Sequence, residues 1–237
     1  MANVAEPILE VRDITKQFPG VLALNNVSAR FLPGEVHAVV GENGAGKSTL
    51  MKILAGAYIP DQGEIIFQGQ SRTFHHPREA QEAGISIIYQ EFNLLPERTV
   101  AQNIFLGREP TRNGLIDRRQ LRRKTLDVLK QVGAEGMISP DIEVKSLSIA
   151  EQQLVEIAKA LSFDSKVLIM DEPTAALATH EVEILTRLMQ KLIAQGMAII
   201  FISHRFTEVF DLANTITILK DGQLVATAPI SEVTPSK

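Results

Sequence analysis

Polar and apolar residues alternate along three early segments of the chain. Residues 8–18, 26–31 and 63–68 show this period of two, which is typical of half-exposed antiparallel strands. Residues 215–219 and 223–228 flank Lys-Asp-Gly, which predicts a hairpin. Four short and nearly continuous apolar runs are typical of buried strands instead: residues 35–40, 85–89, 167–170 and 198–202. The pattern predicts buried strands together with half-exposed antiparallel strands early in the chain.

Helical periodicity covers much of the remaining chain. A helix is expected over residues 48–55, and another from about residue 180 to residue 195. Thr99 is expected to cap a helix that ends at Gly107, and Ser148 could cap the next strongly amphipathic one. The apolar faces of the middle helices are Leu121, Val128, Leu129 and Val132, and then Leu154, Ile157, Ala158 and Leu161. The fold class expected is α/β, with a helical segment inserted at about residues 95–146.

Composition narrows the class of protein. The chain has 237 residues, of which 45% are apolar, so one large domain or two small ones can bury a core. It has no cysteine, which excludes disulfides and cysteine-based metal sites. Its net charge of −4 argues against a dedicated nucleic-acid binder. No apolar run is long enough to span a bilayer and no secretory pattern opens the sequence, so any membrane connection is expected to go through a partner.

The most informative motif lies at residues 41–49, which fit the phosphate-binding pattern G-x-x-x-x-G-K-[ST]. The pattern needs a strand before it and a helix after it, and residues 35–40 and 48–55 supply both. Backbone amides of such a loop and the dipole of the following helix form an anion cradle. Lys47 is then expected to reach the β- and γ-phosphates of a nucleotide, and the Ser48 hydroxyl to hold Mg²⁺. The glycines that let the backbone curl are Gly41, Gly44 and Gly46.

Polar residues follow three of the buried strands. Asp171 and Glu172 end one strand before Pro173, where Asp171 is expected to serve Mg²⁺ and Glu172 to orient or deprotonate a water. Gln90 ends another strand, and His204 follows a third. Carboxyl ends of parallel strands meet at one edge of a sheet, so these residues are expected to face one crevice. Taken alone, a carboxylate pair is commonly a solvated turn and a histidine in this place is usually structural.

Three further features have an ordinary structural interpretation beside a functional one. The ring of Phe18, ahead of Pro-Gly, could lie against an adenine, although an aromatic residue at a turn more often only packs. Ser148 by itself is a good helix cap. The basic cluster at residues 118–124 is a solvated helix face more often than a binding patch.

The order of these motifs along the chain resembles the ATP-binding cassette ATPases of ABC transporters, and the resemblance covers nearly the whole sequence. It implies a P-loop NTPase fold with a RecA-like core built on a mainly parallel sheet, an antiparallel β subdomain and an α-helical subdomain. The resemblance assigns Gln90 to the Q-loop, Ser148 to the signature loop, Asp171 to Walker B, Glu172 as the catalytic glutamate, His204 as the switch histidine and Phe18 to adenine stacking.

Finer features are similar to one branch of this family, the ATPases of monosaccharide importers, in which two cassettes are fused in one polypeptide. The similarity is greatest to the N-terminal cassette, so this chain is expected to be half of a longer tandem protein. The stretches that carry it are residues 16–24, 88–94, 147–153 and 172–177.

Two positions depart from the general family pattern. The signature Leu-Ser-Gly-Gly-Gln is altered because Ile149, Ala150 and Glu151 replace its last three residues, as is familiar in the sugar-importer branch. The Cβ of Ala150 makes the backbone approach to phosphate less close. The loop after Walker B usually carries an aspartate where this chain has Ala178, which puts communication between two ATP sites in question.

The resemblance implies a Mg²⁺-dependent ATPase that powers the import of a monosaccharide. Its implied partners are a second cassette, transmembrane permease subunits and, indirectly, a periplasmic or extracellular substrate-binding protein, with no nucleic acid. The expected location is cytoplasmic, on the inner face of the cell membrane. The catalytic residues expected are Lys47, Gln90, Glu172 and His204; the magnesium ligands are Ser48, Gln90 and Asp171; the ATP contacts are Phe18, Gly41, Asn43, Gly44, Ala45, Gly46, Lys47, Ser48, Thr49, Ser148, Ala150 and Glu151.

Other functions are weighed against this one. A GTPase is disfavoured because the guanine motif Asn-Lys-x-Asp is absent. A soluble cassette of translation or DNA repair predicts nucleic-acid or ribosome binding, which the acidic balance opposes. An importer of nucleosides or of another cargo stays open, since the cassette does not touch the cargo, and so does a cassette that binds ATP without hydrolysing it.

Overall fold

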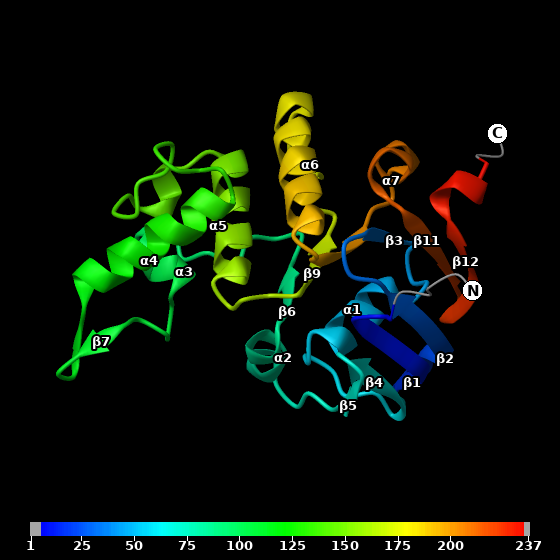
Figure 1. The fold of residues 1–237 in the computed structure, drawn as a ribbon. Helices are drawn as coiled ribbons and strands as arrows, with labels where there is room; N and C mark the ends of the chain where they lie inside the picture. Colours follow the sequence, from blue (N-terminus) through cyan, green and yellow to red (C-terminus); the bar gives the residue numbers. More distant parts are fainter. Residues whose placement is uncertain (1–5, 235–237) are drawn as a thin grey trace. The chain divides into compact units, whose positions relative to one another are not determined.

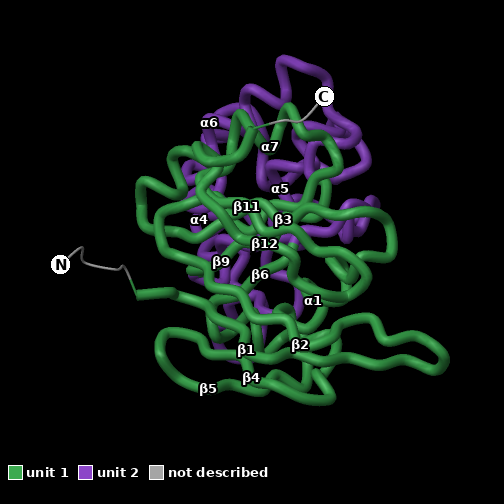
Figure 2. The backbone as a smooth tube through the Cα atoms, turned by 90° about the vertical axis from the view of Figure 1, so that its right-hand side faces the viewer, with its two compact units in different colours: residues 1–87, 165–172, 189–237 green, residues 88–164, 173–188 purple. Residues whose placement is uncertain are grey.

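The computed structural model describes residues 6–234. The chain forms two compact units, shown in different colours in Figure 2. Unit 1 combines residues 1–87, 165–172 and 189–237, and unit 2 combines residues 88–164 and 173–188. The predicted helical insertion, residues 95–146, lies inside unit 2, which also contains later segments of the chain.

A six-stranded sheet of unit 1 has the strand order β12-β11-β3-β10-β9-β6. Strands β11, β3, β10 and β9 are parallel neighbours, whereas β12 pairs with β11 in the antiparallel direction. Every residue of β3 and β10 is buried, as expected for strands with continuous apolar runs. The bounds are Val36–Val40 for β3, Ile85–Ile88 for β6, Val167–Asp171 for β9, Ala198–Ile202 for β10, Thr215–Lys220 for β11 and Gln223–Pro229 for β12. The parallel sheet and the C-terminal hairpin are therefore confirmed.

A four-stranded antiparallel sheet in unit 1 has the order β2-β1-β4-β5. Its strands are β1 (Leu9–Phe18), β2 (Val21–Phe31), β4 (Gln62–Phe67) and β5 (Gln70–Arg72). Strand β2 begins five residues before the predicted start at Asn26, and Asn26 itself has φ +55°. This irregular residue breaks the alternation that would mark one long strand. The three alternating segments are thus confirmed as strands, with one boundary misplaced.

The helices of unit 1 pack around these sheets. Helix α1 (Lys47–Leu54) buries Leu50, Met51, Ile53 and Leu54 in one apolar cluster with residues of both sheets, such as Val11 and Val39. Helices α2 (Pro77–Ala83) and α7 (Phe206–Leu212) are short, and a 3₁₀ turn covers Ile230–Glu232. Helix α6 (Thr179–Ala194) begins in unit 2 and ends in unit 1.

Unit 2 consists mainly of three mutually contacting helices, drawn in green in Figure 1. They are α3 (Val100–Ile104), α4 (Arg118–Gln131) and α5 (Ile149–Leu161), with a 3₁₀ turn at Val144–Ser146 before α5. Thr99 caps α3, as predicted, and the structure adds a reciprocal capping box with Gln102; α3 ends at Ile104 rather than at Gly107.

The sequence reading missed several short elements. Between α3 and α4 the chain forms a hairpin of two very short strands, β7 (Thr111–Arg112) and β8 (Leu115–Ile116), where mostly helix was expected. Asn113 and Gly114 turn it, with φ +53° and +80°, and Asn-Gly is the usual sequence of such a turn. β5, α2 and α7 were missed as well, because each is too short to show a period. None of the described helices is long and apolar enough to cross a bilayer.

Candidate active site

The loop of residues 41–49 connects β3 to α1 in unit 1. Gly46 caps α1 with φ +102°, and a Cβ at this position would lie 2.7 Å from the carbonyl oxygen of Ala23. Both the dihedral angle and the close approach require glycine. Because α1 begins at Lys47, its first amides and the positive end of its dipole lie at the loop. The local sequence therefore builds a backbone cradle suited to an anion.

The side chains of this loop carry its cationic and hydroxyl groups. The Lys47 ammonium donates hydrogen bonds to the carbonyl oxygens of Gly41, at 2.7 Å, and Glu42, at 3.0 Å. It therefore lies against the loop backbone rather than extending away from it. Ser48 is exposed in the first turn of α1, so its hydroxyl is accessible to a ligand.

The end of β9 lies at the same edge of the sheet as the loop. Ile202 of β10 pairs with Asp171 on one side and with Val39 on the other, two residues before the loop begins. Burial raises the pKa of Asp171, the adjacent charge of Glu172 raises it further, and the nearby lysines Lys47 and Lys52 act against both. The loop lysine and the strand-end carboxylate thus belong to one electrostatic site, as the strand-end argument predicts.

Glu172 and His204 form a direct pair at this edge. The Glu172 Oε1 atom lies 2.9 Å from Nδ1 of His204, and the two side chains are 22% and 61% exposed. Glu172 has φ +48°, and its amide donates to the carbonyl oxygen of Ile202 at 2.9 Å. The backbone thus turns sharply directly after the strand and holds a largely sheltered carboxylate against an accessible imidazole. Sequence reasoning placed both residues in one crevice but did not predict their contact.

Phe18 lies at the end of β1 with its ring half-buried. Its ring contacts Tyr58 edge to face, with 5.3 Å between the centroids. Asp61 holds the two residues before Phe18. Its carboxylate pairs with the Lys16 ammonium at 2.7 Å and accepts a hydrogen bond from the Gln17 amide at 2.7 Å. The hydrogen bond from the Gln17 amide lowers the pKa of Asp61 most, and the one from Lys16 lowers it further. The aromatic ring is therefore held by its neighbours, while its contact with adenine stays a prediction.

Gln90 and Ser148 lie in unit 2, so they are not among the groups that unit 1 brings together. Both are exposed. Ser148 caps α5 in a reciprocal box: Glu151 Oε2 accepts from the Ser148 amide at 2.8 Å and from its hydroxyl at 2.9 Å. The predicted cap is confirmed, and the carboxylate of Glu151 occupies the end of the helix where a free anion would be favoured.

Comparison with known proteins identifies the family to which this chain belongs. A family model described as ABC transporter matches residues 24–175. The chain belongs to the ABC transporter family. The match includes the phosphate loop, Gln90, Ser148 and the pair of carboxylates, while His204 lies beyond it.

Curated relatives resemble this cassette over nearly its whole length. It is 48% identical over 232 residues to "Ribose import ATP-binding protein RbsA 3" of Rubrobacter xylanophilus, which covers 98% of this chain and 46% of the relative. It is 49% identical over 234 residues to "Putative ribose/galactose/methyl galactoside import ATP-binding protein 1" of Burkholderia cenocepacia, covering 98% of this chain and 44% of that one. The cassette therefore spans less than half the length of these relatives.

Solved structures share the fold. The cassette aligns with an ATP-binding cassette of an ABC transporter in its ADP conformation, with a TM-score of 0.83, 27% identity and coverage of 95% and 92% of the two chains. A bacterial ABC transporter cassette with a dimeric structure gives a TM-score of 0.78 at 25% identity, covering 94% of this chain and 98% of that one. The α/β class and the cassette fold expected from the sequence are confirmed.

Sequence reasoning also missed two contacts between α5 and the backbone of Asn93. The buried carboxylate of Glu156, on α5, accepts the backbone amide of Asn93 at 2.6 Å, and the Lys159 ammonium donates to the carbonyl oxygen of the same residue at 2.9 Å. Two side chains of the helix that Ser148 caps thus hold both polar backbone groups of a residue three positions after Gln90. A signal existed, because Glu156 interrupts the apolar face of an otherwise amphipathic helix.

The oxygen atoms at the sheet edge suit magnesium. No group of three or more His, Cys, Asp or Glu that could hold a metal ion occurs within residues 6–234. Magnesium, however, usually binds one or two protein oxygens and completes its shell with phosphates and waters. The exposed Ser48 hydroxyl and the Asp171 carboxylate are a donor set of that kind. Burial and the charge of Glu172 raise the pKa of Asp171, and a bound cation would stabilise its ionised form. The residues of unit 1 therefore fit the ion.

Proposed function

We propose that this cassette binds ATP with Mg²⁺ and hydrolyses it to power the import of a monosaccharide. One observation carries the proposal: the glycine loop, the carboxylate of Asp171 and the Glu172–His204 pair lie at one edge of a single sheet. The relatives named as ribose or galactose import proteins support the choice of cargo.

The loop would hold the phosphates of ATP. Backbone amides of residues 41–49 and the Lys47 ammonium would contact the β- and γ-phosphates, so Lys47 would exchange its bonds to the loop carbonyls for bonds to phosphate. Ser48, Asp171 and Gln90 would hold Mg²⁺, which would neutralise negative charge on the phosphates. Phe18 would stack on the adenine.

Glu172 and His204 would carry out the hydrolytic step together. Glu172 would accept a proton from a water whose oxygen forms a bond to the γ-phosphorus. The bond from that phosphorus to the bridging oxygen breaks, and its electron pair leaves with ADP. His204 would orient the Glu172 carboxylate through the 2.9 Å contact and reach the γ-phosphate with its exposed side of the ring.

A second cassette would complete the site. In this proposal Ser148, Ala150 and Glu151 contact ATP held by the partner, which is either the C-terminal half of a tandem protein or a second copy. Two observations support this proposal: the cassette spans only 46% and 44% of two longer relatives, and a solved cassette that it resembles has a dimeric structure. Helical residues 95–146 would contact permease subunits at the cytoplasmic face of the membrane, and a substrate-binding protein would act through those subunits.

Substitution of Glu172 by glutamine tests the hydrolytic role. Glu172→Gln is expected to retain ATP affinity and to lose hydrolysis by two orders of magnitude or more, about the contribution of a general base. Lys47→Ala is expected to lose ATP binding itself. Glu183→Gln, at an exposed position of α6, is the matched control and should behave as the parent chain. Hydrolysis at the parent rate by Glu172→Gln would contradict the assigned role.

The cargo is tested by transport. The chain would be reconstituted in vesicles with its second cassette, permease and binding protein, and uptake of labelled ribose and galactose measured with ATP inside. Sugar-dependent uptake that Glu172→Gln abolishes is the expected result. Hydrolysis without uptake of either sugar would separate the ATPase proposal, which would stand, from the cargo proposal, which would fail.

A further inference from the structure

Positive charge concentrates in the segment of residues 112–124, which covers the short hairpin and the start of α4. It carries six Lys and Arg side chains and one carboxylate, Asp117, a net charge of +5. The whole chain has a net charge of −4, so everything outside the segment carries −9. This segment is therefore a cationic region on an otherwise acidic protein.

The charges are mostly uncompensated. Arg122 pairs with Asp141 at 3.0 Å, both side chains being largely exposed. Within residues 6–234 the other five cations, Arg112, Arg118, Arg119, Arg123 and Lys124, have no carboxylate within ion-pair distance. Asp127 stands four residues after Arg123, the usual helical pairing distance, yet no ion pair forms. The Asp117 carboxylate already accepts the Gln120 amide at 2.9 Å as the cap of α4. An ordinary solvated helix face is usually balanced by such pairs, and this one is not.

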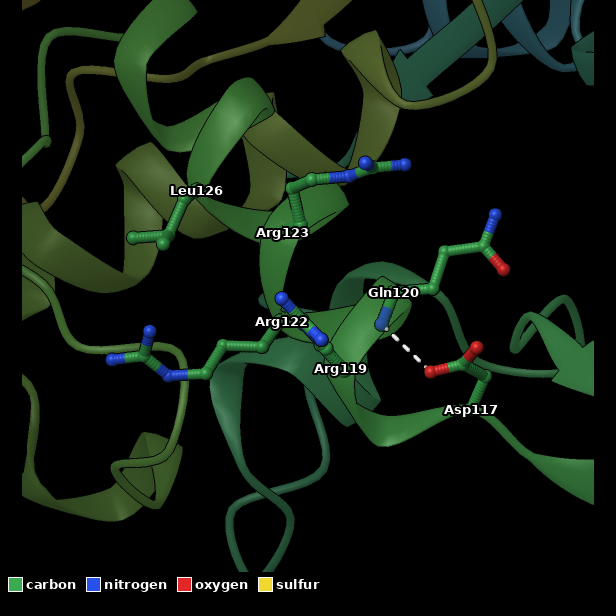
Figure 3. Close-up of a pocket in the computed structure, with 6 residues that line it drawn as sticks. All are labelled: Asp117, Arg119, Gln120, Arg122, Arg123 and Leu126. Carbon is green, nitrogen blue, oxygen red and sulfur yellow. Dashed lines mark hydrogen bonds between the residues drawn. The ribbon is translucent and has the colours of Figure 1, made fainter.

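The arginines form an extended surface rather than a closed anion site. Arg119, Arg122, Arg123 and Leu126 share one face of α4 and line a surface pocket of about 500 Å³. Figure 3 shows the three guanidinium groups pointing away from one another instead of toward a common centre. A site for a single phosphate needs hydrogen-bond donors that converge on one point. Guanidinium groups that point in different directions can instead contact several phosphates on one extended surface.

Exposed apolar side chains adjoin this charge. Leu115 is 76% exposed and Ile116 is 55% exposed. Both belong to β8, immediately before the Asp117 cap, and the Asn113–Gly114 turn with positive φ angles holds them in the hairpin. Aliphatic side chains next to a basic helix face suit a bilayer interface, which offers anionic headgroups and apolar chains together. A nucleic acid backbone offers only the anions.

We infer that residues 112–124 form a docking surface for the anionic phospholipid headgroups of a membrane. The basic face of α4 contacts the lipid phosphates, and the side chains of Leu115 and Ile116 enter the headgroup region of the bilayer. This goes beyond the proposed function, in which the range 95–146 reaches the membrane only through permease subunits; within that range, residues 112–124 would face lipid and the remaining residues the permease. It gives the cassette a direct lipid contact of its own.

The test is flotation of the intact chain with two kinds of vesicle, phosphatidylcholine alone and phosphatidylcholine with 30% phosphatidylglycerol, at about 0.1 M salt. Binding is expected only to the anionic vesicles and is expected to weaken as salt rises. The triple variant Arg119→Gln, Arg122→Gln, Arg123→Gln should bind about 100-fold more weakly, on the order of fivefold for each cation. Leu115→Ser with Ile116→Ser should also weaken binding without changing its salt dependence.

A matched control removes the same charge elsewhere. Arg72→Gln, Lys166→Gln, Arg187→Gln changes three exposed cations outside the segment and should bind as the parent chain does. Any of four results would overturn the inference. The parent chain could bind neutral vesicles as well as anionic ones, or the triple variant could bind as tightly as the parent. The control variant could lose as much binding as the triple variant, or duplex DNA could displace the parent chain from the vesicles. Thermal unfolding of each variant shows that it is folded, and the assay needs no nucleotide, so its outcome is independent of the ATPase proposal.

Discussion

Replacing Gly46 by alanine tests how the phosphate loop is held in shape. Gly46 has φ +102°, and a Cβ there would lie 2.7 Å from both the Ala23 carbonyl oxygen and the Leu24 Cδ2 atom. Gly44 in the same loop has φ +84°, but a Cβ there would have no heavy atom within 4 Å. The two glycines therefore share the conformational requirement and differ in the space around them. Gly44→Ala is the matched control for Gly46→Ala.

The difference between the two variants can be worked out from these contacts. A side chain held at positive φ costs about 1–2 kcal/mol, and this applies to both positions. Only Gly46→Ala adds an overpacking cost of about 1–3 kcal/mol, because the β2 backbone at Ala23 has to move. We expect Gly46→Ala to be less stable than Gly44→Ala by about 2 kcal/mol. For a chain of this length that is a difference of about 4–8 °C in Tm.

Thermal and urea unfolding measure the stability of both variants, and titration with a fluorescent ATP analogue measures their binding. Because β2 contacts the loop at Gly46, displacing it should also weaken ATP binding in Gly46→Ala. Equal Tm values for the two variants would refute the reasoning, since the clash would then cost nothing. A Gly44→Ala variant that is the less stable of the two would refute it more strongly.

Two further predictions concern carboxylates of α5. Burial raises the pKa of Glu156, so its ionisation destabilises the folded chain as the pH rises above about 4.5, the value of an ordinary glutamate. Glu156→Gln can still accept the Asn93 amide. In urea unfolding it is expected to be more stable than the parent at pH 8 and equally stable at low pH. A difference in stability that stays constant at every pH would contradict this. Glu151→Gln keeps the cap of Ser148 but removes the negative charge at the start of α5. Two copies of the cassette should therefore associate about tenfold more tightly in the presence of Mg·ATP. Sedimentation in the Glu172→Gln background measures this association. Unchanged pairing would show that the start of α5 does not meet the partner's phosphates.

Features determined by neighbouring residues could be predicted from the sequence. The phosphate loop is one, because its glycines, its lysine and its flanking strand and helix are contiguous. The parallel strands are another, because continuous apolar runs report burial on both faces. Once these strands were placed in one sheet, the common edge of Asp171, Glu172 and His204 followed from the rule that carboxyl ends of parallel strands meet.

Contacts between residues far apart in the sequence could not be predicted in this way. Nothing local indicates that Glu172 touches His204. Glu156 interrupts an apolar helix face, but nothing local identifies the Asn93 backbone as its partner, since each pair is joined only by the packing of whole elements. The hairpin at Asn113 and Gly114 was missed for a different reason. Its strands have two residues each, too few for any period, and only the turn sequence marked it.

The positions at which the chain passes between its two units bear on how the site could respond to a partner. The chain passes at residues 87–88, 164–165, 172–173 and 188–189. The first lies two residues before Gln90, and the third directly follows Glu172, whose amide is fixed to Ile202 in unit 1. Beyond Gln90, the Asn93 backbone is fixed to α5 by Glu156 and Lys159. Gln90 therefore stands between the passage at residues 87–88 and the fixed backbone of Asn93, whereas Glu172 is itself fixed in unit 1 directly before the passage at residues 172–173.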